Sequence, residues 1–292
     1  MTLTTAQHNI DTLSRKSVLT PEEEFVYTES YRFIIKTTHD PKAMLYLGGY
    51  YYEEKNFGLA KKYYEMAAKA GDMDAIECLG YIYYYGRVGN PDYEKAYYYY
   101  SKAAEAGNLE AATKIADMYH NGYFVAKDEA EYAKRIEALY LKIQSTQNLG
   151  DPYPEITGRY AAIKAANGDT KTAIALYRSA REFLAQRIHY NPFWGNLSIM
   201  QTLLKGLYAL TPFDPKSMDV FDLYEVGKAP HEVHFRSLGK SYQISFAMNE
   251  GHVIVKFLNK AYPSVEDFMR KALLGGEMLV TERDQLYYWE VA

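Results

Sequence analysis

Apolar and small residues recur three and four positions apart along the first half of the chain, a spacing that places them on one face of an α-helix. One such series occurs twice at a constant offset: Ala43, Leu47, Gly48 and Tyr51, then Ala75, Leu79, Gly80 and Tyr83. A second series follows each copy at a slightly larger offset: Ala60, Tyr64, Ala67, Ala68 and Gly71, then Ala96, Tyr100, Ala103, Ala104 and Gly107. A short insertion at 86–91 accounts for the difference. Self-similarity of this period is typical of stacked helix pairs.

Helix boundaries follow from the same pattern. The two clear repeats are expected over residues 41–71 and 72–107, each as helix A, turn and helix B. In the second repeat, helix A covers about 74–85 and helix B about 92–105, and Gly107 is placed to end helix B in a left-handed conformation. Two degenerate copies are expected at 108–144 and 154–188, separated by a turn-rich linker at 148–154. A further helix is expected at 192–209.

The segment before the repeats contains a clear helix start. Thr20 and Glu23 have the spacing of a capping box, and Pro21 stands where its missing N–H does no harm. This helix is expected to continue to Thr38, where Asp40 and Pro41 interrupt it. Residues 1–19 are polar and lack a clear period, so we expect a flexible N-terminus. The helical-repeat solenoid is therefore expected over residues 20–212.

The pattern changes after about residue 217. Alternation of apolar and polar residues at 233–235, 242–246 and 253–257 predicts strands, the last two joined by a hairpin at 249–251. Ser264 and Asp267 predict a capped helix over about 264–274, and residues 286–291 a last strand. Residues 217–292 are expected to form a small α+β module that covers the apolar end of the last helices. The exposed edge of its sheet is available for a homodimer.

Composition and charge narrow the classes of function. Apolar residues make up 48% of the 292 residues and charged residues 24%, which are the proportions of a folded protein. A net charge of −4, without any cluster of five Lys or Arg, argues against nucleic-acid binding. The single cysteine, Cys78, excludes an internal disulfide and a multi-thiolate metal site. No apolar run approaches the ~20 residues of a membrane span, and no signal-peptide core is found, so we expect a cytoplasmic protein.

Catalytic signals are weak. His231, His234 and His252 come nearest to a metal constellation, but residues three apart on a strand face opposite sides of the sheet. The His-x-x-x-His spacing of a zinc helix is absent, as are a phosphate-binding glycine loop followed by Lys-Ser/Thr and the Gly-x-Ser-x-Gly motif. We therefore expect no enzymatic activity, no metal and no cofactor.

The second repeat resembles a Sel1-like repeat, a relative of the tetratricopeptide repeat. The resemblance is carried by Ala75, Leu79, Gly80, Tyr83, Gly86, Asp92 to Ala96, Tyr100, Lys102 to Glu105 and Gly107. It covers about residues 41–188. It implies a mainly α fold, an α/α right-handed superhelical solenoid followed here by the α+β module. It also implies an adaptor that gathers proteins into complexes and has no catalytic residues.

A partner surface is expected on helix A, which lines the inner face in repeats of this type. Residues two before, two after and five after the core leucine lie off the packed seam. Applied to the three copies, this rule gives a set of candidate contacts, to which the adjoining Tyr85 is added. They are Tyr52, Glu77, Tyr81, Tyr84, Tyr85, Asp117 and His120. Tyrosine suits recognition because it offers a large contact area at low entropic cost. Packing between repeats is the alternative role for these tyrosines, since the chain has 31 of them.

Three functions are compatible with this sequence. We predict a protein-interaction adaptor that binds a protein or peptide on the tyrosine-rich inner face of the solenoid. The alternative is a regulator that senses a ligand or peptide and transmits the signal through the C-terminal module. A third possibility is an enzyme with its site in that module.

Overall fold

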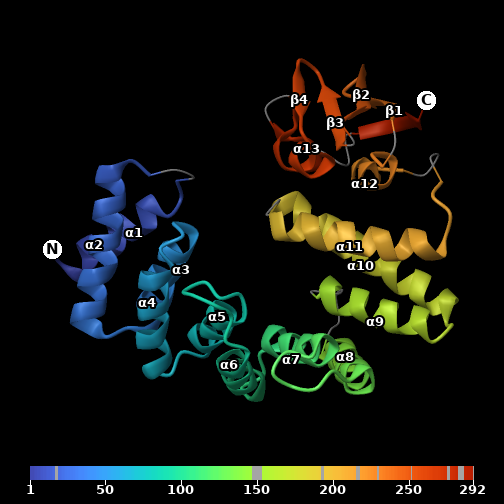
Figure 1. The fold of residues 1–292 in the computed structure, drawn as a ribbon. Coiled ribbons are helices and arrows are strands. Elements are labelled where there is room, and N and C mark those ends of the chain that lie inside the picture. Colours follow the sequence, from blue (N-terminus) through green and yellow to red (C-terminus); the bar gives the residue numbers. More distant parts are fainter. Residues whose placement is uncertain are drawn as a thin grey trace. The chain divides into compact units, whose positions relative to one another are not determined.

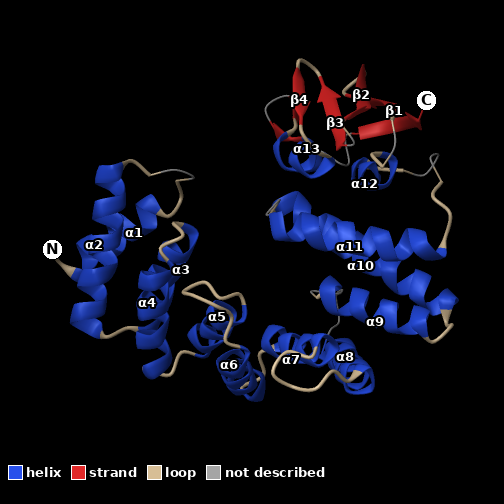
Figure 2. Cartoon of the chain, viewed as in Figure 1, coloured by secondary structure: helices blue, strands red, loops and turns tan. Residues whose placement is uncertain are grey.

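The computed structural model describes residues 1–16, 19–146, 153–191, 194–214, 218–228, 230–250, 252–274, 277–281 and 286–291. The chain forms two compact units, Met1–Arg135 (unit 1) and Ile136–Ala292 (unit 2). Figure 1 labels their elements, and Figure 2 shows that the described residues of unit 1 are helical whereas unit 2 also contains strands. The predicted fold class, paired helical repeats followed by an α+β module, is confirmed.

The described residues of unit 1 form helices, and each helix from the first to the sixth packs on the next one in the chain. The predicted helix boundaries are met within one or two residues. These helices are α1 (Leu3–Leu13), α2 (Pro21–Thr38), α3 (Pro41–Glu53), α4 (Phe57–Lys69), α5 (Met73–Tyr84), α6 (Tyr93–Glu105), α7 (Leu109–Asn121) and the first part of α8 (Glu129–Thr146). Within each clear repeat, helix A packs on helix B, α3 on α4 and α5 on α6.

Short polar side chains start these helices. The capping box predicted at Thr20 and Glu23 is present, with Pro21 as the first residue of α2. From α3 to α7 every helix begins after an Asp or Asn whose side chain accepts a hydrogen bond from a backbone N–H of the first turn. These caps are Asp40, Asn56, Asp72, Asp92 and Asn108. Gly107 follows α6 at φ +96°, the left-handed conformation expected for it.

The N-terminal segment differs from the expected flexible chain. Residues Leu3–Leu13 form α1, whose side chains Ala6, Ile10 and Leu13 are buried. Ala6 and Ile10 belong to the same apolar cluster as Tyr31 and Ile34. The three buried residues lie four and three positions apart and therefore form a narrow apolar stripe on one side of the helix. The other eight residues are polar or exposed, so the sequence shows no clear helical period. The helix is stabilised by burial against α2 rather than by its own composition.

Glycines in helix A allow the tyrosines of helix B to lie flat against its backbone. A Cβ atom placed on Gly48 would stand 2.7 Å from the ring of Tyr64, and one on Gly80 would stand 2.6 Å from the ring of Tyr100. Tyr100 is fully buried and Tyr64 is 5% exposed. The ring and the glycine therefore set how closely the two helices of each repeat approach.

Unit 2 begins with the second part of α8 and continues into helices and a sheet. The turn predicted at 167–169 separates α9 (Pro154–Ala166) from α10 (Thr170–Tyr190), and α11 (Trp194–Leu210) follows. The linker predicted at 148–154 lies mostly outside the described residues. The remaining elements are η2 (Val220–Asp222), α12 (Leu223–Val226), β1 (His231–Ser237), β2 (Lys240–Asn249), β3 (His252–Phe257), β4 (Lys260–Tyr262), α13 (Val265–Lys271), β5 (Leu273–Leu274), β6 (Glu277–Met278), η3 (Leu279–Thr281) and β7 (Leu286–Val291).

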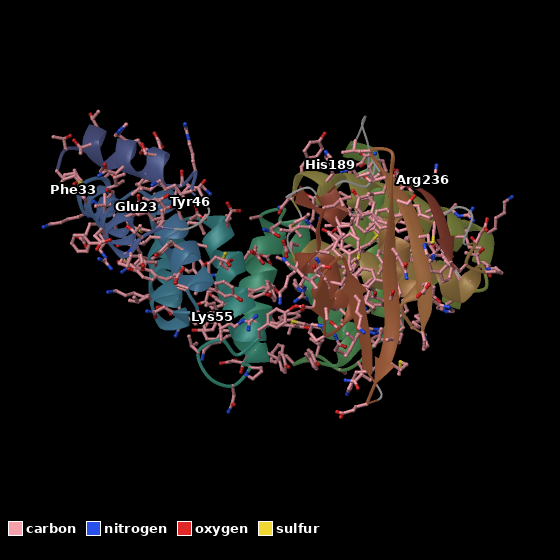
Figure 3. All side chains as sticks on the ribbon, turned by 90° about the horizontal axis from the view of Figure 1, so that it is seen from above. Glu23, Phe33, Tyr46, Lys55, His189 and Arg236 are labelled. Atoms are coloured by element: carbon pink, nitrogen blue, oxygen red, sulfur yellow. The ribbon has the colours of Figure 1, made fainter. Side chains whose placement is uncertain are left out.

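The sheet of unit 2 is antiparallel, with the strand order β4-β3-β2-β1-β7. Its alternation holds: Val233 and Phe235 are buried, whereas Arg236 is exposed and can be followed in Figure 3. The hairpin predicted at 249–251 joins β2 to β3, although Gly251 lies outside the described residues. Helix α13 is capped by Ser264 as predicted but ends at Lys271, because the next residues pair as β5 with β6.

The C-terminal residues do not form a core of their own. One apolar cluster contains Leu184 of α10, Leu204 of α11, Phe221 of η2, Phe235 of β1 and Phe268 of α13. Helices α12 and α13 contact α11 and lie between it and the sheet (Figure 1). The expectation that the module covers the last helices is confirmed. The compact units nevertheless divide the chain at 135–136, whereas the sequence indicated a boundary after 212.

A buried ion-pair network joins α10 and α11 to the start of the C-terminal part. Arg181 on α10 lies 3.1 Å from a carboxylate oxygen of Asp222 and 2.8 Å from one of Asp219. The hydroxyl of Tyr208 on α11 donates to Asp222 at 2.6 Å. Because the Asp222 side chain is only 2% exposed, its charge is stabilised by these partners rather than by water.

We expect Gly48→Ala to destabilise unit 1 by about 1–3 kcal/mol, since the added methyl group displaces the Tyr64 ring from a closely packed site. The neighbouring Gly49→Ala is the matched control, because its Cβ would meet nothing closer than 3.9 Å, the hydroxyl of Tyr64. The control should be neutral or stabilising by about 0.5–1 kcal/mol, through the lower entropy of its unfolded state. Urea unfolding followed by circular dichroism measures both; equal effects would contradict the proposed packing role.

Removing the Asp222 carboxylate leaves Arg181 with a single carboxylate partner in an apolar setting. We expect Asp222→Ala to destabilise unit 2 by about 3 kcal/mol. Glu232→Ala, at an exposed position of β1, should change the free energy of unfolding by less than about 0.5 kcal/mol. Urea unfolding of both variants tests this, and a small effect of Asp222→Ala would show that the network contributes little.

Candidate functional site

Three of the predicted contact residues lie together on the helix A face of unit 1, formed by α3, α5 and α7. Tyr52, Glu77 and Tyr81 line a cavity of about 190 Å³, which we call the helix A pocket. Its other lining residues are Tyr64, Cys78 and Glu110. The pocket thus receives side chains from the first three repeats. The sequence rule found the two tyrosines and Glu77 but missed Glu110, which stands about two turns before Asp117, the first position chosen on α7.

An array of tyrosine rings extends from the pocket. The ring centroids of Tyr52 and Tyr81 are 5.8 Å apart, and those of Tyr81 and Tyr85 are 4.4 Å apart. The guanidinium of Arg87 lies between 5.4 and 5.8 Å from all three ring centroids, a cation–π arrangement that holds the rings in place. Arg87 was not singled out from the sequence. The sequence nevertheless contained an indication of its role, because Arg87 lies in the 86–91 insertion that distinguishes the second repeat from the first.

Among the ring pairs of the described residues, Tyr84 contacts this array only at Tyr85, with 4.9 Å between the ring centroids. Its ring is half-buried among Tyr93, Tyr100 and Tyr123, with centroid separations of 5.7, 6.1 and 5.9 Å. Five positions after Leu79 the helix is about to end, so its side chain meets the inter-helix loop rather than the open face. These contacts favour, for Tyr84, the packing role that was the alternative for these tyrosines.

Asp117 and His120 continue the face along α7 but do not line the pocket. His120 is exposed, and its Nδ1 lies 2.8 Å from a carboxylate oxygen of Glu129 at the start of α8. Its ring also contacts Tyr132, at 4.8 Å between centroids. Burial, followed by the charge of Asp117, raises the pKa of Tyr84, which places this carboxylate near the packed tyrosines. Of the seven predicted residues, three line the pocket, Tyr85 adjoins them, Tyr84 is packed among other rings, and Asp117 and His120 lie on α7.

The electrostatics of the pocket are governed by its carboxylates. Burial, with the charge of Glu110 as the second cause, raises the pKa of Glu77 to about 7. Lys114 acts in the opposite direction, and its Nζ donates to the hydroxyl of Tyr85 at 3.1 Å. Burial and the charge of Glu77 raise the pKa of the Cys78 thiol to about 12, so this cysteine is an inert lining group rather than a nucleophile.

The histidines of the C-terminal strands do not form a metal site within the described residues. His231 and His234 lie opposite Phe246 and Gln243 of β2, and His252 stands at the start of β3. No group of three His, Cys, Asp or Glu side chains suited to a metal ion occurs in the described part of the chain. Among the helices in the described ranges, none has the length and apolar character to cross a bilayer.

The raised pKa of Glu77 predicts a pH-dependent stability. The folded state binds this proton more tightly than the unfolded state, so the stabilisation is full below about pH 4.5 and is lost as the pH rises through about 7. Relative to Glu77→Gln, the wild type should lose on the order of 2 kcal/mol between about pH 5 and pH 8. Urea unfolding of both proteins at the two pH values measures the difference; parallel pH profiles would contradict it.

Comparison with known proteins identifies the repeats. The family model for the Sel1 repeat matches residues 41–72, 79–108 and 109–135. The third copy, weak in the sequence, is thus a Sel1 repeat, whereas the fourth helix pair at 154–188 lies beyond the match. Comparison with curated proteins gave no match.

Several solved structures match this chain at low identity and with TM-scores below 0.5. A Sel1 repeat protein from Oxalobacter formigenes has 21% identity and a TM-score of 0.49, over 70% of this chain and 88% of that one. A protective antigen of uropathogenic Escherichia coli strains with an SLR fold has 17% identity and a TM-score of 0.41, over 71% and 53%. The C-terminal part of a TPR repeat-containing protein from Cytophaga hutchinsonii has 15% identity and a TM-score of 0.35, over 73% and 93%. On the family-model match, residues 41–135 of this chain are a Sel1-repeat array of three copies.

Proposed function

We propose that this protein is a non-enzymatic interaction scaffold that binds a segment of a partner protein on the helix A face of α3, α5 and α7. Sel1 repeats generally serve as protein-interaction scaffolds. The observation that carries the proposal here is the helix A pocket, an open cavity beside the adjoining rings of Tyr52, Tyr81 and Tyr85. Tyrosine and arginine side chains of this kind supply much of the binding energy at protein interfaces.

The tyrosine array is ordered before any partner arrives. Tyr85 is 41% exposed, yet its ring is held by Tyr81, Arg87 and the hydrogen bond from Lys114. A side chain that is already fixed loses little conformational entropy on binding. Tyr52 and Tyr81 are partly buried and line the pocket. The array therefore offers a rigid amphipathic contact surface of the kind that favours recognition of a protein segment.

The size of the pocket favours a protein or peptide segment over a small-molecule ligand, which is one form of the sensing alternative. Pockets for small-molecule ligands usually measure about 300–1,000 Å³ and enclose most of the ligand. A cavity of about 190 Å³ suits one inserted side chain, the remainder of the segment lying on the surrounding tyrosines. No specific observation on the described residues favours the metabolite-sensing or enzymatic alternatives. A cytoplasmic location and homodimer formation through β4 or β7, the outer strands of the sheet, stay predictions.

Loss of the tyrosine array should abolish partner capture without unfolding the repeats. We expect Tyr81→Ala combined with Tyr85→Ala to reduce the amount of captured partner about tenfold or more in affinity capture from native cell lysate, quantified by mass spectrometry. Tyr98→Ala is the matched control, because Tyr98 is a 52% exposed tyrosine on α6. Melting temperatures establish that all variants remain folded. Equal capture by the double variant and the control would overturn the proposal.

A further inference from the structure

We propose that the helix A pocket receives a positively charged side chain, an arginine or a lysine, from the partner segment. This inference rests on the proposed function and specifies its partner: a segment with a basic residue at the point of deepest contact. The inference is carried by three features of the pocket. Two carboxylates supply negative charge, three tyrosines supply aromatic rings, and the cavity between them supplies the space.

The carboxylates of the pocket come from two different repeats. Glu77 is on α5 and Glu110 is on α7, and both line the cavity, Glu110 being exposed. They are close enough for the charge of Glu110 to act on the pKa of Glu77. Two like charges so placed repel one another, and a cation placed between them would relieve that repulsion.

Nearby cations of the protein are engaged elsewhere. Lys42 forms ion pairs with Asp72 and Asp74, at 2.9 and 2.7 Å. Arg87 lies over the tyrosine rings, and Lys114 donates to Tyr85 while lying 5.4 Å from the centroid of its ring. Within the described part of the chain, no ion pair within 4 Å involves Glu77 or Glu110. Lys114 therefore offsets part of the charge of this acidic pair without forming an ion pair with either carboxylate.

A buried tyrosine hydroxyl outside the pocket lining belongs to the same electrostatic setting as the carboxylates. Tyr100 is fully buried, and its hydroxyl has no hydrogen-bond partner among the described residues. After burial itself, the charge of Glu77 is the largest cause that raises the pKa of Tyr100, so the hydroxyl lies within reach of the pocket's field. Buried polar atoms are rarely left unpaired, because the loss of hydration is costly. Tyr100 is not among the residues that line the pocket, so this cost belongs to the setting of the carboxylates and is not a contact for the incoming side chain.

The aromatic lining favours an organic cation over a metal ion. The rings of Tyr52, Tyr64 and Tyr81 offer π faces and edges to a guanidinium or ammonium group, and hydrocarbon contact to its stem. The Glu77, Cys78 and Glu110 side chains do not converge as a metal-ligand group in the described residues. An acidic partner segment would meet Glu77 and Glu110 as like charges and would be excluded.

Cation binding at this site is linked to the proton on Glu77. An inserted cation favours the ionised carboxylate, so affinity should increase as the pH rises from about 6 to about 8. The titratable groups that surround Glu77 are Asp74, Cys78 and Tyr81 on α5, Glu110 and Lys114 on α7, Tyr100 on α6, Tyr64 on α4 and Tyr52 on α3. The raised pKa values of Cys78, Tyr52, Tyr64 and Tyr100 keep those groups protonated over this range.

The test uses the full chain and two capped pentapeptides, Gly-Ser-Arg-Ser-Gly and the same peptide with citrulline, the neutral isostere of arginine. Heteronuclear NMR titration at pH 8 should show shifts at Glu77, Gly80 and Glu110 with the arginine peptide, and binding weaker by about tenfold or more with citrulline. Glu77→Gln combined with Glu110→Gln should weaken arginine binding by a similar factor. Glu105→Gln, which removes an exposed carboxylate of α6 outside the pocket, should leave it unchanged.

Equal affinity for the two peptides, unchanged affinity in the double glutamine variant, or no shifts at the pocket residues would each overturn the inference. The capture experiment separates this failure from failure of the proposed function. If capture depends on Tyr81 and Tyr85 but persists in Glu77→Gln/Glu110→Gln, the scaffold proposal stands and the cation site is wrong. If capture depends on neither pair, the proposed function itself fails.

Discussion

The contact between a helix B tyrosine ring and a helix A glycine is the constraint on which the repeat unit depends. Tyr64 lies on Gly48 and Tyr100 lies on Gly80, each at a distance that no side chain larger than hydrogen would permit. This contact fixes the separation of the two helices in each repeat. Because Tyr64 also reaches the helix A pocket, the same packing that holds the repeat together forms one wall of the candidate site. Stability and the shape of the binding face are therefore coupled.

Tyrosine fills two roles in this molecule, and its chemistry allows both. In the core its ring supplies a large apolar area, as at the fully buried Tyr100. On the helix A face its hydroxyl stays accessible while its ring packs against neighbours, as at Tyr85. Tyr84 and Tyr85 show how close the two roles are, because they are consecutive residues and only the second ring is exposed. Arg87 lies beside the rings of Tyr52, Tyr81 and Tyr85 and joins them into one array. The array is thus held in place while Tyr85 stays exposed to solvent.

The fold disfavours the charge on Glu77. Burying Glu77 near Glu110 disfavours its ionised form, and the unpaired Tyr100 hydroxyl adds a further cost. Unit 2 treats its buried charges differently, since Asp222 is satisfied by Arg181, Tyr208 and a backbone N–H. The charges of the Asp222 network are paired within unit 2, whereas Glu77 and Glu110 form no ion pair within 4 Å among the described residues and are available to a partner. That contrast supports a binding role for the face formed by unit 1.

Sequence by itself determined the repeats, the helix starts and the seam residues of this protein, and it also indicated the strands of the C-terminal part. These features depend on periodicity and on caps such as Thr20 and Asp72, whose partners lie within a few residues. Tertiary structure alone decided that α1 is buried, that Glu77 shares a cavity with Glu110, that Arg87 reaches the tyrosines, and that the C-terminal strands share a core with α10 and α11. Each of these depends on contacts between residues distant in the chain. Such contacts are set by how faces pack, which the local pattern of any one segment does not specify.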